Sequence, residues 1–349
     1  MALLRGIVFR TLSKVYCDAC IFGELMQKIA NIQVMRGIAA LAVTLFHVAG
    51  TQEKESLNGW LFSAFKGWGS WGVDLFFIIS GYVMAVSLSK SNDTAAHFLL
   101  KRFIRIYPLY FVLTILYCLI SVVTPQLFTS FKLNPEWLLA SLSFTSGFAG
   151  FGEPILGQGW TLEFEALFYL SIGIVVVLRQ NHRLEFLTLA VLLGLCSFGV
   201  NSIILEFGFG MIAARFKKNF HNLQSFRFVP IALGITSLVL FRFIEFENIP
   251  RFLLFGIPCA SIFLGFLLIS PFKNSFFLYL GEISYSIYLI QFFIIPVFFK
   301  FLKSDFNSEL YCDIRGVLAI LTIFLSSHLT HKYIEVKSAK FLKKSFKII

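Results

Sequence analysis

Charged side chains are scarce in this sequence. Asp, Glu, Lys and Arg make up 14% of the 349 residues, whereas hydrophobic residues make up 57%, and the mean hydropathy is +0.79. A typical soluble domain has roughly 25% charged residues, and a soluble core could not bury this much apolar surface. The shortage of charge therefore excludes a water-soluble globular protein and predicts a polytopic membrane protein.

Acidic residues are scarcer than basic ones. The chain has 19 Asp and Glu residues against 30 Lys and Arg residues, which gives a net charge of +11. Such an excess can indicate a nucleic-acid partner. Here, however, the Lys and Arg residues lie in short loops between apolar runs, where positive charge sets orientation in a membrane. We therefore expect no nucleic-acid partner.

Motifs of several common enzyme classes are missing. The six cysteines are scattered, and Cys17 and Cys20 form a lone C-x-x-C pair without a second pair or a nearby histidine. We therefore expect neither a disulfide framework nor a metal site. The sequence has no P-loop, G-x-S-x-G elbow or H-E-x-x-H helix, which argues against nucleotide-hydrolysing, serine-hydrolase and zinc-protease mechanisms.

Ten apolar runs are long enough to cross the roughly 30 Å hydrocarbon core of a bilayer. They lie near residues 32–50, 71–89, 106–124, 160–178, 184–200, 202–216, 228–244, 252–270, 277–299 and 314–331. A further apolar piece at 137–151 is shorter and rich in Ser and Gly.

Positive charge in the loops distinguishes ten crossings from eleven. If 137–151 does not cross, the basic loops fall on one side, which the positive-inside rule assigns to the cytoplasm. If it crosses, the loop with Arg179 and Arg183 moves outside. We therefore predict an all-α bundle of about ten transmembrane helices, with both termini cytoplasmic and with 137–151 as an interfacial or re-entrant helix.

The chain divides into three parts. Residues 1–30 lack the long apolar run and cleavage site of a secretory signal peptide, so we expect a cytoplasmic leader, or a start codon assigned too early with Met26 as the true one. Residues 31–335 are expected to form one integral membrane domain without internal repeats. Residues 336–349 are expected to be a basic cytoplasmic tail.

Two ionisable residues, Arg36 and His47, lie in the first apolar run. At 100° per residue their eleven-residue spacing places them on one helix face, roughly 16 Å apart along the axis. Ionisable groups inside a membrane are costly to bury and commonly mark a substrate or proton path. We expect a functional pair; the alternative is a polar pair that packs helices together.

Carboxylates gather with His47 in the predicted outer half of the bundle. Asp74 enters the second span from outside, and Glu163 and Glu165 enter a later span from the same side. A histidine near a carboxylate can act as a general base towards a hydroxyl group. Asp74 and Glu163 can alternatively be explained by the helix dipole, which favours acids at a helix N-terminus. Glu165 lies deeper.

The predicted inner half is basic. Arg36 begins the first span, and Arg102 and Arg105 lead into the third. Guanidinium groups bind phosphate through paired hydrogen bonds, so this cluster suits a phosphorylated ligand from the cytoplasm. The alternative, ordinary anchoring at lipid headgroups, applies best to Arg102.

These segments resemble the membrane acyltransferase-3 family, whose pattern runs from an Arg, ten residues and a His to a late Ser-Tyr-Ser-x-Tyr-Leu segment. Five blocks match in the family's order: Arg36 to His47, Asp74–Tyr82, Arg105–Tyr110, Trp160–Tyr169 and Ser284–Leu289. The amino-acid sequence of Pro154–Leu162 is most similar to the exopolysaccharide and O-antigen O-acetyltransferase branch of the family.

The resemblance implies transfer of an acyl group, usually acetyl from acetyl-CoA, to a sugar hydroxyl of a surface or exported polysaccharide. Acetyl-CoA would be a substrate rather than a bound cofactor, and the acceptor a glycan or lipid-linked oligosaccharide beside the lipid of a bacterial inner membrane. His47 would be the general base, although a transient acyl-histidine is an alternative. Arg36, Glu165 and Asp74 complete the expected catalytic set.

The same resemblance suggests contacts for both substrates. CoA phosphates are expected at Arg36, Arg102 and Arg105. The expected acceptor and oxyanion contacts are Trp160, Tyr285, Tyr288 and Gln291. Trp160 can also be explained as an interfacial belt residue. Relatives commonly have a histidine where this chain has Gln291, which cannot carry a proton at neutral pH, so a proton relay there is in doubt.

Two other readings of the sequence predict different behaviour. A transporter or flippase of glycan intermediates also fits ten spans with intramembrane charge, although related halves and matching broken helices are missing. A catalytically silent scaffold in a glycan-assembly complex would keep full function after His47→Ala.

Overall fold

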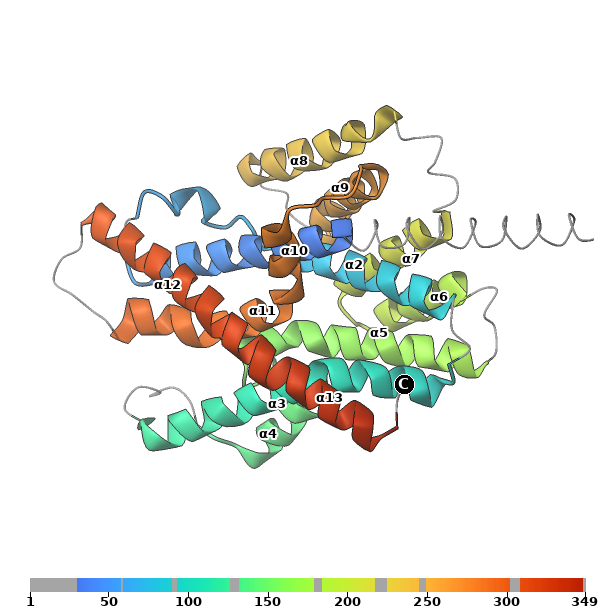
Figure 1. Cartoon of the computed structure of the whole chain (residues 1–349), viewed down its shortest axis with the longest axis horizontal. Helices are drawn as coiled ribbons and strands as arrows, with labels where there is room; N and C mark the ends of the chain where they lie inside the picture. Colours follow the sequence, from blue (N-terminus) through green and yellow to red (C-terminus); the bar gives the residue numbers. More distant parts are fainter. Residues whose placement is uncertain are drawn as a thin grey trace, which may run out of the picture.

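The computed structural model describes residues 30–57, 59–89, 93–125, 132–178, 184–216, 225–244, 249–301 and 308–347, and this part of the chain is helical without any strand (Figure 1). The all-α prediction is therefore confirmed for the described residues. Nearly all of the expected leader, including Cys17, Cys20 and Met26, lies outside them, as do Arg179 and Arg183 and the last two residues of the basic tail.

The helices follow one another through short connections. After the first helix, Ala30–Lys54, they are η1 (Ser63–Phe65), α2 (Trp71–Leu88), α3 (Ala95–Val123), α4 (Pro135–Leu142), η3 (Gly157–Gly159), α5 (Trp160–Val177), α6 (Leu184–Ser197), η5 (Ser202–Leu205), α7 (Glu206–Phe216), α8 (Phe228–Phe243), η7 (Phe252–Gly256), α9 (Ile257–Leu268), α10 (Ser275–Glu282), α11 (Ser284–Pro296), η8 (Val297–Phe301), α12 (Glu309–Thr330), η9 (His331–Glu335) and α13 (Val336–Ser345).

Among the described residues, five helices are long and apolar enough to cross a membrane. They are Ala30–Lys54, Trp71–Leu88, Ala95–Val123, Gly157–Val177 and Glu309–Ser345. A bent pair, Ser275–Glu282 and Ser284–Lys300, makes a sixth if it counts as one span with a 68° bend. The chain is an integral membrane protein, and its described residues form five or six long apolar helices.

Three further apolar helices, Leu184–Ser197, Phe228–Phe243 and Phe252–Leu268, have fewer than 18 residues. About 20 apolar residues are needed to cross a bilayer at full thickness. The expectation of about ten spans and of two cytoplasmic termini therefore stays a prediction.

The segment 137–151 contains only a short helix. α4 has eight residues and is preceded by the N-cap residue Asn134, whose side chain accepts a hydrogen bond from the Glu136 backbone N–H. Eight residues span roughly 12 Å, too little to cross a bilayer. The following turn is held by Glu163, whose carboxylate accepts hydrogen bonds from the backbone N–H groups of Ser146 (2.7 Å) and Gly147 (3.0 Å). Glu163 thus fixes this segment against the start of α5.

Glycines allow the central helices to pack closely. A Cβ atom added to Gly81 would collide with the backbone of Phe207, and one added to Gly210 would collide with that of Ile78, so α2 and α7 are in backbone contact. Gly281 meets the Gln33 backbone in the same way, which joins α10 to the first helix. Small residues at helix crossings are typical of membrane bundles.

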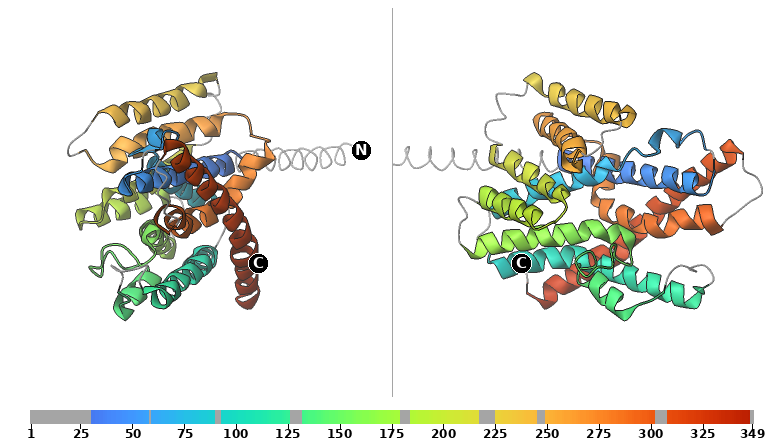
Figure 2. Two further views of the ribbon diagram at one scale, coloured as in Figure 1. Left: turned by 90° about the vertical axis from the view of Figure 1, so that its left-hand side faces the viewer. Right: turned by 180° about the vertical axis from the view of Figure 1, so that it is seen from behind.

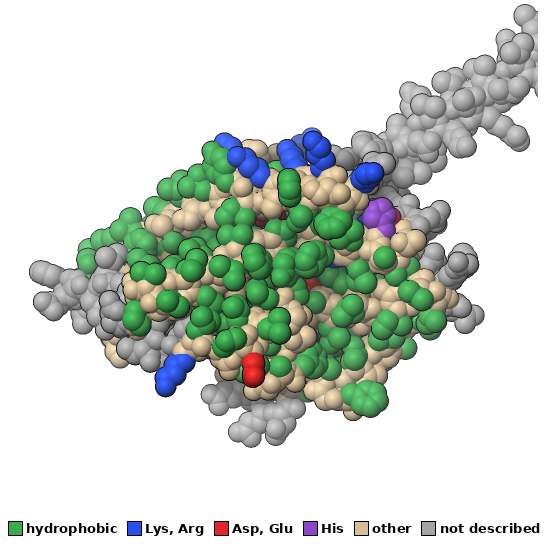
Figure 3. Space-filling model, turned by 90° about the horizontal axis from the view of Figure 1, so that it is seen from below, with side chains coloured by type: hydrophobic (Ala, Val, Ile, Leu, Met, Phe, Trp, Pro, Cys, Tyr) green, Lys and Arg blue, Asp and Glu red, His purple; other side chains and the backbone are tan. Residues whose placement is uncertain are grey.

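The bundle is layered, with α8 and α9 at one edge, α3 and α4 at the opposite edge, and the first helix, α2 and α5 between them (Figures 1 and 2). α12 crosses these helices obliquely. A broad face of the molecule is covered by hydrophobic side chains, while most visible Lys and Arg side chains lie along one border of it (Figure 3). Such a surface suits contact with lipid.

Candidate active site

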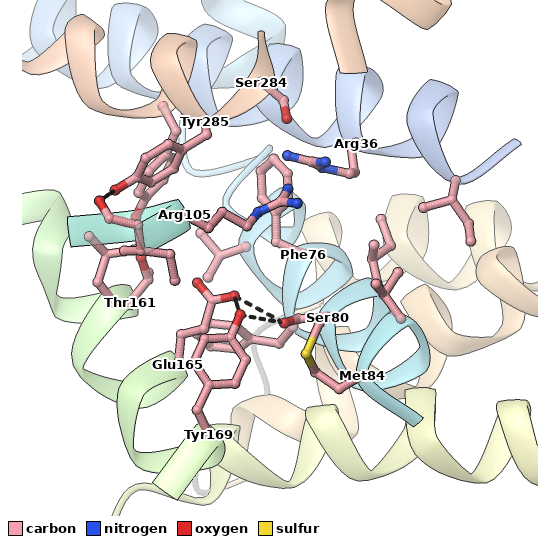
Figure 4. Close-up of a pocket in the computed structure, with 18 of the residues that line it drawn as sticks. Arg36, Phe76, Ser80, Met84, Arg105, Thr161, Glu165, Tyr169, Ser284 and Tyr285 are labelled. Atoms are coloured by element: carbon pink, nitrogen blue, oxygen red, sulfur yellow. Dashed lines mark hydrogen bonds between the residues drawn. The ribbon is translucent and has the colours of Figure 1, made fainter. Parts of the chain in front are cut away.

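A cavity of about 250 Å³ lies between the first helix, α2, α3, α5 and α11 (Figure 4). α2 contributes one face from Val73 to Met84, which corresponds to roughly 16 Å along the helix axis. The cavity is therefore long. Its polar lining residues are Gln33, Arg36, Ser80, Arg105, Thr161, Glu165, Tyr169, Ser284, Tyr285 and Tyr288.

Two arginines lie together in the cavity, beside Phe76 of α2 (Figure 4). Figure 4 shows the Arg36 and Arg105 side chains pointing toward each other, from the first helix and from α3. Within the described residues, neither guanidinium has an ion pair or a hydrogen bond. Two adjacent positive charges without a paired carboxylate are unfavourable in a bundle interior. Their donors suit a phosphate or another multiply charged anion.

Glu165 lies on the same cavity wall and is held by two hydroxyl groups. Its Oε1 atom accepts a hydrogen bond from Ser80 Oγ at 3.0 Å and another from the Tyr169 hydroxyl. Tyr169 lies one turn after Glu165 on α5, and Ser80 comes from α2. These bonds fix the carboxylate between the two helices, where it faces Arg105 (Figure 4).

On the same side of the cavity, α11 is hydrogen-bonded to the start of α5 and to α3. The Tyr288 hydroxyl donates to the Gln158 carbonyl at 3.0 Å, and Thr161 Oγ1 donates to the Tyr288 hydroxyl at 3.0 Å. The Tyr285 hydroxyl donates to the Ile106 carbonyl at 2.7 Å. Both tyrosine protons are therefore engaged, so either tyrosine must exchange its partner before it can donate to a ligand.

His47 does not line this cavity. The ring is half-buried, lies edge-on to Phe46 with centroids 5.2 Å apart, and has no hydrogen bond within the described part of the chain. Close contacts of Gly69 and Gly72 with Ala42 and Ala39 place the start of α2 beside the middle of the first helix. Val73 is the outermost α2 residue of the lining and follows Gly72, which meets Ala39. The cavity therefore ends about two and a half turns before His47.

Asp74 is fully buried and paired with an arginine outside the cavity. Arg251, at the start of η7, approaches the carboxylate through Nη2 at 2.6 Å and Nε at 3.1 Å. Arg251 Nη2 also donates to the Ser70 carbonyl at 3.0 Å. The pair therefore joins α2 to η7, and sequence reasoning missed Arg251 because 177 residues separate it from Asp74.

The remaining predicted site residues also lie outside the cavity lining. The Arg102 guanidinium packs on the Phe98 ring at 5.5 Å, and Trp160 packs edge-on against Phe77 at 6.4 Å. Gln291 is fully buried and donates through Nε2 to the Tyr288 carbonyl at 3.1 Å. The structure thus brings together five predicted residues and separates five others. The cavity holds Arg36, Arg105, Glu165, Tyr285 and Tyr288, but not His47, Asp74, Arg102, Trp160 or Gln291.

Sequence reasoning assigned no role to Ser80 or Tyr169. A signal for Tyr169 was available, since a residue four positions after Glu165 lies on the same helix face. Ser80 stands inside the Asp74–Tyr82 block, but its distance to Glu165 depends on how α2 packs against α5. Among the described residues, no group of three or more His, Cys, Asp or Glu side chains is arranged to hold a metal ion.

Known proteins were compared with the whole chain. A family model described as an acyltransferase domain matches residues 29–330. The exopolysaccharide production protein ExoZ of Rhizobium meliloti (strain 1021) is 35% identical over 163 residues, which cover 42% of this chain and 51% of that protein.

Two further relatives are more distant. Nodulation protein 10 of Rhizobium leguminosarum bv. viciae is 32% identical over 181 residues, covering 46% of this chain and 48% of that protein. Acyltransferase MdmB of Streptomyces mycarofaciens is 31% identical over 152 residues, which cover 41% of this chain and 38% of that protein. The chain thus spans about half the length of these relatives or less. No solved structure matches it significantly.

Proposed function

Since the chain belongs to the acyltransferase family whose model covers residues 29–330, we propose that it transfers an acetyl group from acetyl-CoA to a sugar hydroxyl of an exported or surface polysaccharide in a bacterial inner membrane. The family resemblance drawn from the sequence motifs is confirmed. The polysaccharide acceptor is supported by the similarity to an exopolysaccharide production protein.

The proposal of acetyl-CoA as the donor rests on the long cavity and on the two unpaired guanidinium groups that line it. Acetyl-CoA has phosphates at one end of a flexible arm and a reactive thioester at the other. In our proposal the phosphates bind Arg36 and Arg105, and the arm lies along the α2 face that ends at Val73. At about 250 Å³ the cavity is smaller than a typical ligand pocket of roughly 300 Å³ or more, so the nucleotide would remain outside it.

His47 would act beyond the Val73 end of the cavity. The acceptor hydroxyl loses its proton to the imidazole as its oxygen attacks the thioester carbonyl carbon, and a tetrahedral intermediate forms. When the carbon–sulfur bond breaks, the imidazolium returns the proton to the departing thiolate, so the products are an acetylated sugar and CoA with a free thiol. The thioester must extend past Thr161 and Tyr288 to reach His47.

Tyr288 is the stronger of the two candidate oxyanion donors. Its hydroxyl lies at the end of the cavity nearest His47, whereas the Tyr285 hydroxyl donates to Ile106 on α3. If the Tyr288 proton moves from the Gln158 carbonyl to the thioester oxygen, it stabilises the negative charge that develops there. Glu165, held by Ser80 and Tyr169, would keep the cavity wall beside the arginines in shape without touching the reacting atoms.

The proposal is tested by the O-acetyl content of surface and secreted polysaccharide, measured by proton NMR. Cells would carry the wild-type gene, a deletion, His47→Ala or the control His97→Ala, whose ring pairs with Asp93 at the start of α3. We expect acetyl signals to disappear in the deletion and in His47→Ala and to persist in His97→Ala. Unchanged acetyl signals in the deletion would contradict the proposal, and accumulated lipid-linked glycan would then indicate the transporter reading.

A further inference from the structure

The last described helix is basic and lies apart from the cavity. α13 continues from α12 through η9, so that Glu309–Ser345 is one helix of 37 residues (Figure 1). At 1.5 Å per residue it is roughly 55 Å long. Even at a tilt of about 40° it extends beyond a hydrocarbon core of roughly 30 Å. One end of this helix must therefore lie among lipid headgroups or in water.

The sequence identifies α13 as that end. The segment 336–347 contains five lysines and no Asp or Glu. Glu335, the preceding residue, accepts hydrogen bonds from Ser286 Oγ and His331 Nδ1, both at 3.0 Å. Its carboxylate is engaged inside the bundle, so it is not available to neutralise the lysines of α13.

Four lysines of α13 form a stripe that faces away from the protein. At 100° per residue they fall within an arc of about 120°, and all four side chains are exposed. The half-buried residues Ser338, Ala339 and Leu342 lie on the opposite side of the helix, and α13 packs against α3. The lysine stripe consists of Lys337, Lys340, Lys343 and Lys344.

Aromatic side chains border the lysine stripe. The Tyr333 ring, one turn earlier, lies 4.7 Å from Lys337 Nζ and 5.4 Å from Lys332 Nζ, and Phe341 is exposed. Aromatic rings mixed with lysines are typical of helices at the boundary between hydrocarbon and headgroups. Figure 3 shows Lys and Arg side chains gathered along the border of the apolar face, which is where headgroups would lie.

We propose that the lysine stripe of α13 binds the headgroups of anionic phospholipids in the adjacent leaflet. Within the described residues, none of the four lysines has an ion pair. Their charge is therefore unbalanced by the protein and complements a negatively charged membrane surface, which attracts such juxtamembrane lysines. The stripe points away from the body of the protein, so a ligand of the cavity would not reach it.

The test is lipid retention by the purified full chain, measured by native mass spectrometry with phosphatidylglycerol or phosphatidylcholine added to the detergent. In one variant the four stripe lysines are replaced by glutamine. The matched control replaces four lysines elsewhere, Lys66, Lys132, Lys273 and Lys300, so that both variants lose the same charge. A third variant replaces the stripe lysines by arginine.

We expect the wild type, the control and the arginine variant to retain phosphatidylglycerol over phosphatidylcholine. The glutamine variant should lose at least about tenfold of that preference. Added salt should weaken retention by the wild type. Equal retention of both lipids by the wild type, or equal loss in the stripe and control variants, would overturn the proposal. Because no acyl donor is present, the result does not depend on the proposed function.

Discussion

Two groups of buried charged residues in this bundle contain similar side chains and differ in how the charges are balanced. Around Asp74, the guanidinium of Arg251 is bound by a carboxylate at two positions, and no ligand is needed to neutralise it. In the cavity, Arg36 and Arg105 face each other, and the nearby carboxylate of Glu165 is hydrogen-bonded by hydroxyl groups instead.

The difference separates a structural role from a binding role. A buried ion pair with good geometry holds two helices in place, and removing one partner leaves a costly buried charge. Two unpaired guanidinium groups in a cavity weaken the empty bundle and are stabilised when an anion arrives. The Asp74–Arg251 pair should therefore affect stability, and the Arg36–Arg105 pair should affect ligand affinity.

The largest expected effect is on the structural pair. Asp74→Asn removes the carboxylate to which Arg251 is hydrogen-bonded. It should lower the free energy of unfolding by about 3 kcal/mol, at the lower end for a broken buried pair, because a third of the Arg251 side chain is exposed. Thermal unfolding in detergent measures this. Asp93→Asn, which breaks a more exposed pair with Lys101, should cost less than about 1 kcal/mol. Equal losses of stability in the two variants would contradict the structural role of the buried Asp74–Arg251 pair.

The next effect is on donor binding. Arg36→Gln removes charge-assisted hydrogen bonds to phosphate, so the affinity for acetyl-CoA should fall about tenfold to hundredfold. Relief of repulsion from Arg105 should leave the unfolding temperature unchanged or raised. Calorimetric titration with acetyl-CoA measures the affinity, and Arg227→Gln, whose guanidinium lies over the Phe228 ring outside the cavity, is the control. If the Arg36→Gln protein were less stable than the wild type and bound acetyl-CoA with normal affinity, Arg36 would have a structural role rather than a binding role.

A smaller effect on acetyl-CoA binding is expected when one of the hydrogen bonds to Glu165 is removed. Tyr169→Phe removes one of the two hydrogen bonds to this carboxylate, which should cost about 1–2 kcal/mol and appear as a raised KM for acetyl-CoA. Tyr107→Phe is the matched control, because the Tyr107 ring stacks on Phe103 outside the cavity lining. A change in kcat alone would instead place Tyr169 at the reacting atoms.

The smallest effect is expected at Glu206. Its carboxyl group lies beside that of Asp74, is fully buried, and has no hydrogen-bond partner for either oxygen by strict geometry within the described residues. Two buried carboxyl groups with one guanidinium reach neutrality when one of them carries a proton. Glu206→Gln should therefore change stability by less than about 1 kcal/mol, measured by thermal unfolding. A loss as large as that of Asp74→Asn would show that Glu206 is ionised.

Local sequence patterns predicted much of the fold and part of the site. Apolar runs located the helices, because burial in lipid requires continuous hydrophobic stretches, and motif order located Arg36, Arg105, Glu165, Tyr285 and Tyr288. The Asp74–Arg251 pair was missed because it joins distant segments. The predicted apolar runs from α6 to α9 agree with the observed helices to within three residues. Whether these shorter helices cross the membrane stays a prediction, since hydropathy alone does not decide it.

The position of His47 relative to the cavity could not be predicted from the sequence either. Helix periodicity placed it on the same face as Arg36, and this periodicity is a property of one helix. Where the cavity ends depends on the packing of α2, α5 and α11, and on the hydrogen bonds of Tyr288 and Thr161. The step that remains to be tested is passage of a thioester beyond these two side chains.

The most direct test of the account is a structure of the protein with a non-hydrolysable acetyl-CoA analogue. We expect phosphate oxygens within hydrogen-bond distance of Arg36 and Arg105, and the arm lying against Phe77 and Val73 of α2. The carbonyl group should point past Tyr288 towards His47. An analogue bound elsewhere, or one whose thioester end lies at the arginines, would contradict the proposed donor site.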